Sequence, residues 1–480
     1  MKSYFNSLSS IFEQFSSRKL FIDEAFNEAK YSDVIDFSLR NNFNSTNRSL
    51  VFCLIENEIG GLLGYLSLLT NCAVPLLLNS KISAEQLRKL IYIYQPAYIW
   101  LPSTRAQEFY KSDLLVCNQG YSLLDLKFPC RDIHKSLALL LSTSGSTGSP
   151  KFVKISVENL LSNALSISQY LGLRSDDIPI TTLPPSYTYG VSIIHSHILA
   201  GATIAVTNKT LFDRAFWNFF REARATSFNG VPYHYEMLKK LRFTKMQLPS
   251  LRTMTQAGGR MHPDLTREFA SYCQQQGMQF FTMYGQAEAT ARMSYLPSER
   301  AVTKAGSVGI AIPGGEFSLV DESGHLINQN DVPGELVFKG PNVSMGYADG
   351  YEDLAKGDER GGVLRTGDVA KRDKDGDYYI VGRLKRFIKL FGHRVNLQNV
   401  ETHLSESGYS VACQGQDDRL EIYACDIIQA QAIDIKKRCI DLLQVTPAAV
   451  VVYVIGKIPR SEAGKIQYSE LKSYVGVLLA

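Results

Sequence analysis

Apolar runs that suit buried β-strands alternate with segments of helical periodicity over most of the chain. The strand-like runs are LVFCLI (50–55), AVPLLL (73–78), PAYIWL (96–101) and LALLLST (137–143). Between them, the segment SAEQLRKLIYIY begins with a serine suited to an N-cap and has apolar residues three and four positions apart, which predicts a helix. Strands that alternate with helices in this way predict an α/β fold with largely parallel sheets.

The stretch from Ile59 to Leu78 carries no charged residue and resembles a membrane span in that respect. Glycines lead it, however, and Asn71 and Pro75 interrupt it before the apolar run ends. A membrane helix needs about 20 consecutive apolar residues. We therefore expect a buried helix followed by a strand, and no membrane span.

Beyond residue 300 the strand-like runs become short and are bounded by turn sequences such as DESG (321–324) and DKDGD (373–377). This predicts a smaller antiparallel β unit. The last segment begins with the basic stretch LKRFIKLFGHR (384–394), and its pattern predicts a small α+β module. We place the domain boundary near Leu384–Lys385. The expected fold class is α/β: a large N-terminal domain of layered α/β subdomains and a small β unit, followed by a small mobile α+β domain.

The composition excludes several classes of protein. A chain of 480 residues suggests two or three compact units. Its formal net charge of +4 is small for this length and gives no basis for a nucleic-acid partner. The eight cysteines include no CxxC pair, so a zinc or dithiol site is not expected, and the N-terminus shows no secretory signal. Scattered cysteines without such a signal lead us to expect a cytoplasmic protein.

The loop LSTSGSTGSPK (141–151) joins two strand-like runs and is rich in hydroxyl side chains, with two glycines and one lysine. Such a tract can be a flexible linker. Gly145 and Gly148 also permit backbone turns whose consecutive N–H groups bind anions, and Lys151 adds a positive charge. The Walker A and GxGxxG patterns are both absent. The loop is therefore a candidate phosphate-binding loop of another type.

Further motifs follow in a fixed order: MYGQAEA (283–289), GELVFKGPNVSMGY (334–347), RTGDVAKRDKDGDYYIVGRLKRFIKLFGHRVNLQNVE (365–401) and IPRSEAGKIQ (458–467). Together with the loop, they resemble the signature motifs of the adenylate-forming superfamily. That superfamily includes acyl-CoA synthetases, the adenylation domains of nonribosomal peptide synthesis, and firefly luciferase. The resemblance covers nearly the whole chain. It implies an AMP-binding domain over residues 1–383 and a domain that carries a catalytic lysine over residues 384–480.

The resemblance assigns the nucleotide-binding positions. The loop would hold the phosphates of ATP, Tyr284 would stack on adenine beside AGGR (257–260), Glu288 would help to bind Mg²⁺, and Asp368 and Arg383 would approach the ribose and the α-phosphate. The full set is Thr143, Ser144, Gly145, Ser146, Thr147, Gly148, Lys151, Gly258, Gly259, Arg260, Tyr284, Gly285, Gln286, Ala287, Glu288, Asp368 and Arg383. These residues could instead have purely structural roles: turns for the loops, a core aromatic for Tyr284, and surface ion pairs for Asp368 and Arg383.

Two positions depart from the family pattern. Phe152 stands where the family usually has glycine, and Ala287 stands where it has threonine. The missing hydroxyl would normally bond near the α-phosphate, and Gln286 or Thr290 are candidates to replace it.

The resemblance also assigns the chemistry. Lys465 would reach between the carboxylate of the acid and the α-phosphate of ATP, where negative charge develops. Lys385 stands where the family has a hinge, about which the C-terminal domain turns after adenylation. A thiol would then attack the acyl adenylate and release AMP.

The segment LPPSYTYGVS (183–192) resembles the part of the family that lines the acyl pocket, with Val231, Pro232, Tyr233 and Met283 as further lining positions. Tyr187 falls where the family gates the tunnel for the thiol. Thr188 falls where members that activate α-amino acids carry an aspartate for the substrate ammonium, so a carboxylic acid without that amine is favoured.

The acceptor is either coenzyme A or the phosphopantetheine arm of a separate carrier protein, since no carrier domain follows Lys465. Basic residues near the hinge suit either one: Lys385, Arg386, Lys389 and Arg394. Three other activities stay open: a stand-alone amino-acid adenylation enzyme that loads a separate carrier, a non-catalytic binder of nucleotide or acyl ligand, and luciferase-like oxygenation.

Overall fold

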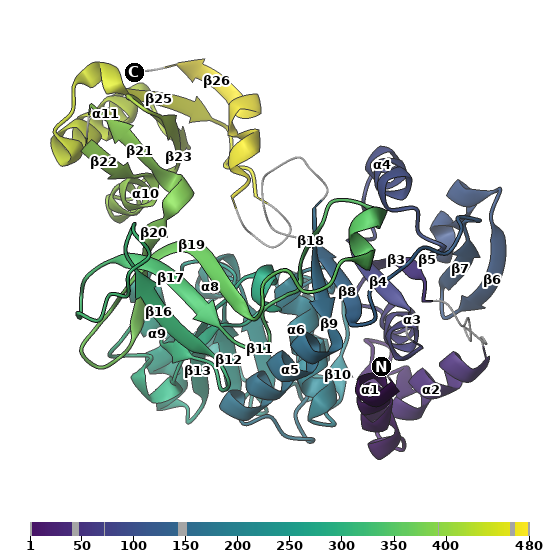
Figure 1. Ribbon diagram of the computed structural model, residues 1–480. Helices are drawn as coiled ribbons and strands as arrows, with labels where there is room; N and C mark the ends of the chain where they lie inside the picture. Colours follow the sequence, from purple (N-terminus) through teal and green to yellow (C-terminus); the bar gives the residue numbers. More distant parts are fainter. Residues whose placement is uncertain are drawn as a thin grey trace. The chain divides into compact units, whose positions relative to one another are not determined.

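The computed structural model describes residues 2–40, 48–71, 73–142, 151–391, 393–460 and 466–478 (Figure 1). They form two compact units. The first contains the described residues up to Ser142, residues 151–317 and Phe338–Leu364, and the second contains residues 318–337 and those from Arg365 onward. The expected α/β class is confirmed, whereas the domain boundary near residue 384 stays a prediction.

An eight-stranded sheet in the first unit has the order β18-β9-β8-β4-β3-β5-β7-β6. Its four central strands, β8, β4, β3 and β5, are parallel, and the strands toward both edges are antiparallel. The strands are β3 (Leu50–Ile55), β4 (Val74–Asn79), β5 (Tyr98–Pro102), β6 (Asp113–Asn118), β7 (Tyr121–Asp125), β8 (Leu137–Ser142), β9 (Phe152–Ser156) and β18 (Gly346–Ala348). The four strand-like runs at residues 50–143 are thus confirmed.

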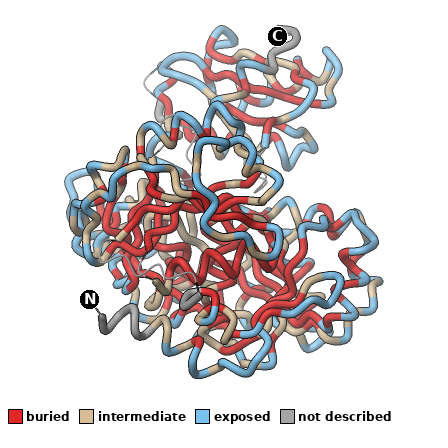
Figure 2. Tube along the Cα trace, turned by 90° about the vertical axis from the view of Figure 1, so that its right-hand side faces the viewer, coloured by how far each residue is buried: buried red, intermediate tan, exposed pale blue. Residues whose placement is uncertain are grey.

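Both faces of this sheet are buried, as the alternation along β3 shows. Val51, Cys53 and Ile55 contribute to one apolar cluster, and Leu50, Phe52 and Leu54 contribute to another. Residues of α3, α5 and α6 cover the first face, and residues of α4 cover the second. Figure 2 shows buried stretches of the trace in the interior and exposed stretches at the outside. The helices of this region are α1 (Lys2–Gln14), α2 (Tyr31–Arg40), α3 (Ile59–Thr70), α4 (Ala84–Tyr94), α5 (Val157–Leu171) and α6 (Thr188–Leu199).

Two of these helices test predictions directly. Ser83 caps α4, and its side chain accepts a hydrogen bond from the backbone N–H of Gln86, as the sequence predicts. The uncharged stretch at residues 59–78 forms the buried helix α3 and the strand β4, which is also as predicted. Among the described residues, no helix has both the length and the apolar character that crossing a membrane requires.

A second sheet in the first unit has the order β11-β12-β13-β14-β15. Its first three strands are parallel, and β14 and β15 run antiparallel to their neighbours. The elements are β11 (Ser227–Gly230), α8 (Pro232–Lys240), β12 (Thr253–Gln256), α9 (Pro263–Gln275), β13 (Gln279–Tyr284), β14 (Ser294–Leu296) and β15 (Ile310–Ala311), with α7 (Arg214–Glu222) before them. Residues of α7, α8 and α9 bury one face, and residues of α5 and α6 bury the other. A small sheet, β10-β1-β2, completes the unit: β1 (Lys19–Ile22), β2 (Glu28–Lys30) and β10 (Ile204–Ala205).

The turn-rich region folds into a four-stranded sheet, β16-β17-β19-β20, and the last segment is an α+β module, as predicted. The sheet consists of β16 (Glu316–Val320), β17 (Gly334–Lys339), β19 (Val363–Arg372) and β20 (Tyr378–Arg383). The module contains β21 (Phe387–Leu390), β22 (His393–Asn396), α10 (Leu397–Glu406), β23 (Ser410–Gln416), β24 (Arg419–Cys425), α11 (Gln429–Leu443), β25 (Val450–Ile455) and β26 (Val475–Leu478). Its core packs α10 and α11 against the sheet β23-β24-β25-β26.

Candidate active site

Three neighbouring parallel strands end where the sequence places acyl-binding and adenine-binding residues. Val231 follows β11, Gly258 and Gly259 follow β12, and Tyr284 ends β13. Because the three strands are parallel and adjacent, their carboxyl ends lie along one edge of the sheet. In open α/β sheets, ligands bind outside this edge.

Gly258 has a backbone reason to be glycine. Its φ is +83°, and a Cβ there would lie 2.4 Å from the hydroxyl of Tyr187 and 3.2 Å from Val231 Cγ1. The loop after β12 therefore packs against two residues predicted to line the acyl pocket. The neighbouring Arg260 is exposed.

Met283 and Tyr284 are successive residues of β13, so their side chains point to opposite faces of the sheet. Met283 belongs to the apolar cluster that residues of α5 and α6 form with Val231 and Tyr189. Tyr187 and Thr188 stand at the start of α6, and Thr188 is buried. The structure thus brings the four predicted acyl-binding residues, Tyr187, Thr188, Val231 and Met283, to one region of the first unit.

A tight turn follows Tyr284. A Cβ at Gly285 would lie 1.7 Å from the carbonyl oxygen of Ala291, so only glycine fits there. Thr290 and Ala291 both have positive φ, at 53° and 102°, which is unusual for residues with a side chain. Strain of this kind persists where surrounding contacts impose it, and such residues cluster at functional sites.

Tyr347 contacts charged residues of the first unit that are candidates for binding the phosphates and Mg²⁺. Its hydroxyl donates a hydrogen bond of 2.7 Å to Glu288 Oε1, and Lys151 Nζ lies 3.9 Å from its ring centroid. The guanidinium of Arg360 lies 4.8 Å from the same centroid. Burial, reinforced by the charge of Glu288, raises the pKa of Tyr347 to about 12, so the hydroxyl stays a donor. Lys151 and Glu288, which are far apart in sequence, therefore meet at one aromatic ring.

Arg360 was not predicted. Its Nη1 is buried and has no hydrogen-bond partner in the part of the chain that the structure describes. The surrounding sequence, GDERGG, has the composition of a solvated turn and gives no signal of this role.

Arg292 is a second residue that the sequence analysis missed. It is 3% exposed, and its guanidinium lies 4.0 Å from the ring centroid of Tyr189. Its Nε points at Met283 Sδ, at 3.4 Å. Its position just before β14, three residues beyond MYGQAEA, is the only signal in the sequence.

The two departures from the family pattern have structural explanations. Phe152 is buried in the core beneath the large sheet, edge-on to Tyr94 with ring centroids 5.3 Å apart. Ala287 packs against the apolar cluster on the other face of that sheet. Thr290, a candidate replacement for the missing hydroxyl, donates its hydroxyl proton to the carbonyl of Asn342 at 2.8 Å. Gln286 Nε2 lies 3.5 Å from the hydroxyl of Tyr284.

In the second unit, Asp368 and Arg383 are directly opposite each other on β19 and β20. Arg383 Nε donates to Asp368 Oδ1 at 2.7 Å. The carboxylate is buried, whereas 59% of the arginine side chain is exposed. Lys385 is exposed in the short 3-10 helix Leu384–Arg386.

The remaining predicted residues lie outside the described part of the chain. They are Thr143, Ser144, Gly145, Ser146, Thr147, Gly148 and Lys465.

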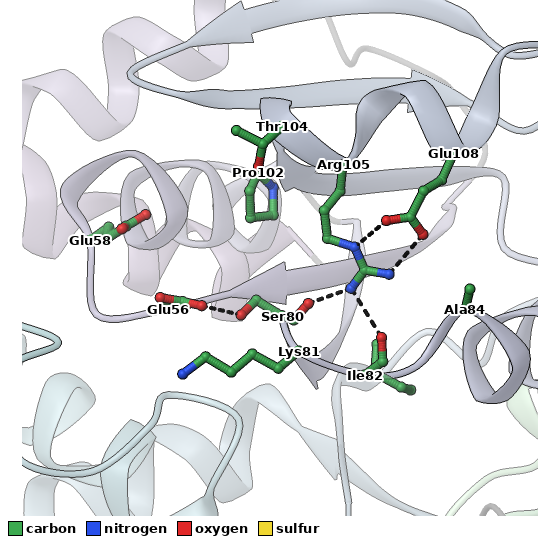
Figure 3. A pocket seen from close by; sticks show the side chains of 10 residues that line it. All are labelled: Glu56, Glu58, Ser80, Lys81, Ile82, Ala84, Pro102, Thr104, Arg105 and Glu108. Atoms are coloured by element: carbon green, nitrogen blue, oxygen red, sulfur yellow. Dashed lines mark hydrogen bonds and ion pairs between the residues drawn. The ribbon is translucent and has the colours of Figure 1, made fainter.

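A depression of about 550 Å³ lies elsewhere in the first unit, at the carboxyl ends of β3, β4 and β5 (Figure 3). Three carboxylates, of Glu56, Glu58 and Glu108, and two cations, Lys81 and Arg105, line it. Arg105 is engaged by Glu108 through hydrogen bonds of 2.6 and 2.8 Å. This lining does not suit a polyphosphate, and it includes no predicted site residue. No cluster of three or more potential metal-ligating side chains occurs within the described ranges.

A family model described as AMP-binding enzyme matches residues 49–348. The chain belongs to the AMP-binding enzyme family. The recognition of the adenylate-forming superfamily from its motifs is thereby confirmed.

The curated relatives of this AMP-binding enzyme include several CoA ligases and a delta-poly-L-ornithine synthetase of Acinetobacter baumannii. It is 28% identical to an oxalate–CoA ligase of Arabidopsis thaliana over 69% of this chain and 66% of that protein. It is 26% identical to a 2-succinylbenzoate–CoA ligase of Bacillus cereus over 84% of this chain and 83% of that protein. The first alignment thus spans slightly less than two thirds of the relative. The predicted class of enzyme, an AMP-forming acid–thiol ligase, agrees with these relatives.

Solved structures share the fold over nearly the whole chain. An o-succinylbenzoate CoA synthetase of Bacillus subtilis, in complex with an acyl-adenylate intermediate, superposes with a TM-score of 0.78 at 19% identity, covering 97% of both chains. ATP-bound MatB of Rhodopseudomonas palustris gives a TM-score of 0.77 at 21% identity, covering 97% of this chain and 98% of that chain.

Proposed function

We propose that this AMP-binding enzyme activates a carboxylic acid with ATP and transfers the acyl group to a thiol. In the first step a carboxylate oxygen attacks the α-phosphorus, the bond to the β-phosphate oxygen breaks, and pyrophosphate leaves. In the second step the thiol sulfur attacks the acyl carbonyl, the bond to the phosphate oxygen breaks, and AMP leaves. The thiol proton is released to solvent.

The arrangement around Tyr347 carries this proposal. Lys151 and Arg360 supply positive charge on the ring of Tyr347, and Glu288 supplies a carboxylate at its hydroxyl. A carboxylate beside substrate phosphates is the usual protein contribution to a Mg²⁺ site, so these residues fit that ion. Bound Mg²⁺ would neutralise phosphate charge. Nη1 of Arg360, which has no hydrogen-bond partner among the described residues, is a donor that suits a phosphate oxygen.

The other nucleotide contacts are proposed from the motifs. Tyr284 stacks on adenine beside Gly258 and Gly259. Asp368, which Arg383 already holds in place, accepts hydrogen bonds from the ribose. Lys465 stabilises the charge that develops at the α-phosphate during attack.

The acid is proposed to lack an α-ammonium group. Thr188 provides no carboxylate, and the buried cation Arg292 contacts Met283. A buried ammonium without a carboxylate partner is costly, and a second cation nearby adds repulsion. Amino-acid adenylation is therefore the less favoured alternative.

The acceptor is proposed to be coenzyme A, because several of the curated relatives are CoA ligases. A separate phosphopantetheinyl carrier protein presents the same thiol and is the other candidate acceptor.

Acid-dependent ATP–pyrophosphate exchange tests the proposal. A panel of aryl, fatty, hydroxy and amino acids should give exchange with at least one acid, and that acid should then yield a thioester with coenzyme A. Exchange followed by transfer only to a phosphopantetheinylated carrier would replace coenzyme A as acceptor. ATP binding without exchange on any acid would contradict ligase activity and favour a non-catalytic binder.

A further inference from the structure

Arg292 is a buried cation without an acidic partner in the described part of the chain. It is 3% exposed, and its polar contacts there are with the thioether of Met283 and the neutral hydroxyl of Tyr170. The residues outside the described ranges contribute one acidic side chain, Glu462. A guanidinium stays protonated at any physiological pH and has five N–H donors. Burying it without a carboxylate is costly, so an anion is expected to complete the site when ligand binds.

The surroundings of Arg292 hold the guanidinium in one place. Its backbone carbonyl accepts hydrogen bonds from the side chains of Asn163, at 3.0 Å, and Asn342, at 2.8 Å. The guanidinium stacks on Tyr189, and the two residues before it are the positive-φ pair Thr290 and Ala291. A strained turn and two buried side-chain amides therefore fix the backbone at Arg292, and this fixes the direction of its side chain.

Three tyrosines surround the charge. Burial raises the pKa of Tyr170, Tyr187 and Tyr189, to about 12 for the last two, and the positive charge of Arg292 opposes the rise in each. The hydroxyl of Tyr170 donates to Met283 Sδ at 3.0 Å. These neutral hydroxyls and rings solvate the guanidinium but do not neutralise it.

Arg292 lies on the acyl side of β13. It contacts Met283, which faces the cluster of α5 and α6, whereas Tyr284 points to the opposite face. The carboxylate that reacts must lie at the α-phosphate, near the residues proposed to bind the nucleotide. The anion expected to bind Arg292 is therefore a group on the part of the acid that lies away from the reacting carboxylate.

We propose that Arg292 determines substrate specificity by binding a second anionic group on the acid, so that the substrate class is a dicarboxylic or otherwise dianionic acid. This inference rests on the proposed function. A charge-assisted hydrogen bond of this kind contributes about 1.5–3 kcal/mol, which corresponds to about 10- to 100-fold in rate or affinity.

Matched pairs of acids test the proposal: butyrate and succinate, hexanoate and adipate, benzoate and terephthalate. In ATP–pyrophosphate exchange, the wild-type enzyme should prefer the diacid of at least one pair by about 10- to 100-fold. Arg292→Gln should abolish that preference by lowering exchange with the diacid about 10- to 100-fold more than exchange with the monoacid, while Arg292→Lys should retain part of it. Thermal unfolding and ATP affinity of both variants serve as controls for folding.

Four results would overturn the inference. They are the absence of any diacid preference in the wild type, an equal loss with both members of a pair, a loss of ATP affinity in Arg292→Gln, and a preference that survives the substitution. Calorimetric binding of the diacids to the ATP-saturated protein separates this inference from the proposed function. Diacid binding that depends on Arg292 without exchange would uphold the anion site and contradict adenylation. Exchange with monoacids alone would uphold adenylation and overturn the anion site.

Discussion

Tyr347 is the residue at which the candidate phosphate-binding groups of the first unit meet. Its ring contacts the cations of Lys151 and Arg360, and its hydroxyl binds the carboxylate of Glu288. One side chain therefore fixes the positions of three charges. Cation–π contacts contribute about 0.5–2 kcal/mol each, so they orient Lys151 and Arg360 without neutralising them. Both cations can therefore still bind an anion.

Replacement of Arg360 by glutamine tests its assignment to the phosphates. We expect Arg360→Gln to weaken ATP binding by about 10- to 100-fold and AMP binding by less than about twofold, because the lost donor serves the β- or γ-phosphate. Isothermal titration calorimetry with each nucleotide measures this difference. Arg267→Gln is the matched control, since Arg267 is an exposed arginine of α9 that pairs with Asp264. An equal loss for ATP and AMP would contradict the assignment.

Single residues set the limit of what the sequence could predict here. Motif order marks Lys151, Glu288 and Gly258 as candidates, and their roles stay predictions. Motif order does not mark Arg292 and Arg360, because an arginine becomes notable only when its donors are buried without an acidic partner, and tertiary packing alone determines that. Phe152 shows the converse: a departure from a motif reflected core packing against Tyr94.

Elements were predicted more completely than residues. The apolar runs at β3, β4, β5 and β8 are largely buried strands, whose signal needs no knowledge of tertiary contacts. The antiparallel strands at both edges of the large sheet were not predicted as parts of it, because pairing partners are set by strands far apart in sequence. β18 pairs with β9 across almost 200 residues.

In the C-terminal module, one largely buried ion pair, with side chains 16% and 12% exposed, links four elements. Arg386 Nη2 donates to Glu401 Oε1 at 2.7 Å, the hydroxyl of Tyr468 donates to Glu401 Oε2 at 3.2 Å, and the guanidinium lies 3.9 Å from the ring centroid of Tyr468. The backbone N–H of Cys413 donates to the same carboxylate. The cluster therefore links Arg386, which follows the predicted hinge residue Lys385, to Tyr468, which lies three positions after the predicted catalytic residue Lys465.

The stability of this cluster should depend on pH. Burial raises the pKa of Glu401, and Arg386 opposes the rise. Because the folded pKa is above the unfolded value, the associated stability is present at low pH and is lost as the pH rises through the folded pKa. Without Arg386 the pKa rises further, so Arg386→Met should destabilise the protein more at pH 8 than at pH 5.

Thermal unfolding of the full chain at both pH values measures this effect. Removal of one partner of a buried ion pair costs about 3–5 kcal/mol, so we expect a clear loss at pH 8 and a smaller one at pH 5. Arg438→Met is the control: Arg438 pairs with Asp434 on the surface of α11, where solvent screens such pairs and they contribute little to stability. An equal loss for Arg386→Met at the two pH values would show that Glu401 stays ionised without its partner.

At the scale of the whole molecule, the predicted chemistry is divided between two compact units. Lys151, Tyr284 and Glu288 belong to the first, and Asp368, Arg383 and Lys385 belong to the second. The described residues that flank Lys465 also belong to the second unit, where Ile466 pairs with Arg460 and Gln467 N–H donates to Pro459. The family resemblance predicts that residues of both units take part in each half-reaction and that the second unit turns between the two half-reactions.

Two substitutions should separate the half-reactions. Lys465→Ala removes the cation expected at the α-phosphate, so it should slow adenylation by about 10²–10³-fold, leave ATP affinity nearly unchanged, and still allow thioester formation from a supplied acyl adenylate. Lys385→Pro fixes φ at the predicted hinge and should do the reverse: keep ATP–pyrophosphate exchange and lose thioester formation. Lys385→Ala removes the same side chain without restricting φ and should retain both reactions. If both half-reactions fall together in Lys385→Pro, or if Lys465→Ala adenylates normally, then the chain does not divide its chemistry between two arrangements about residue 385.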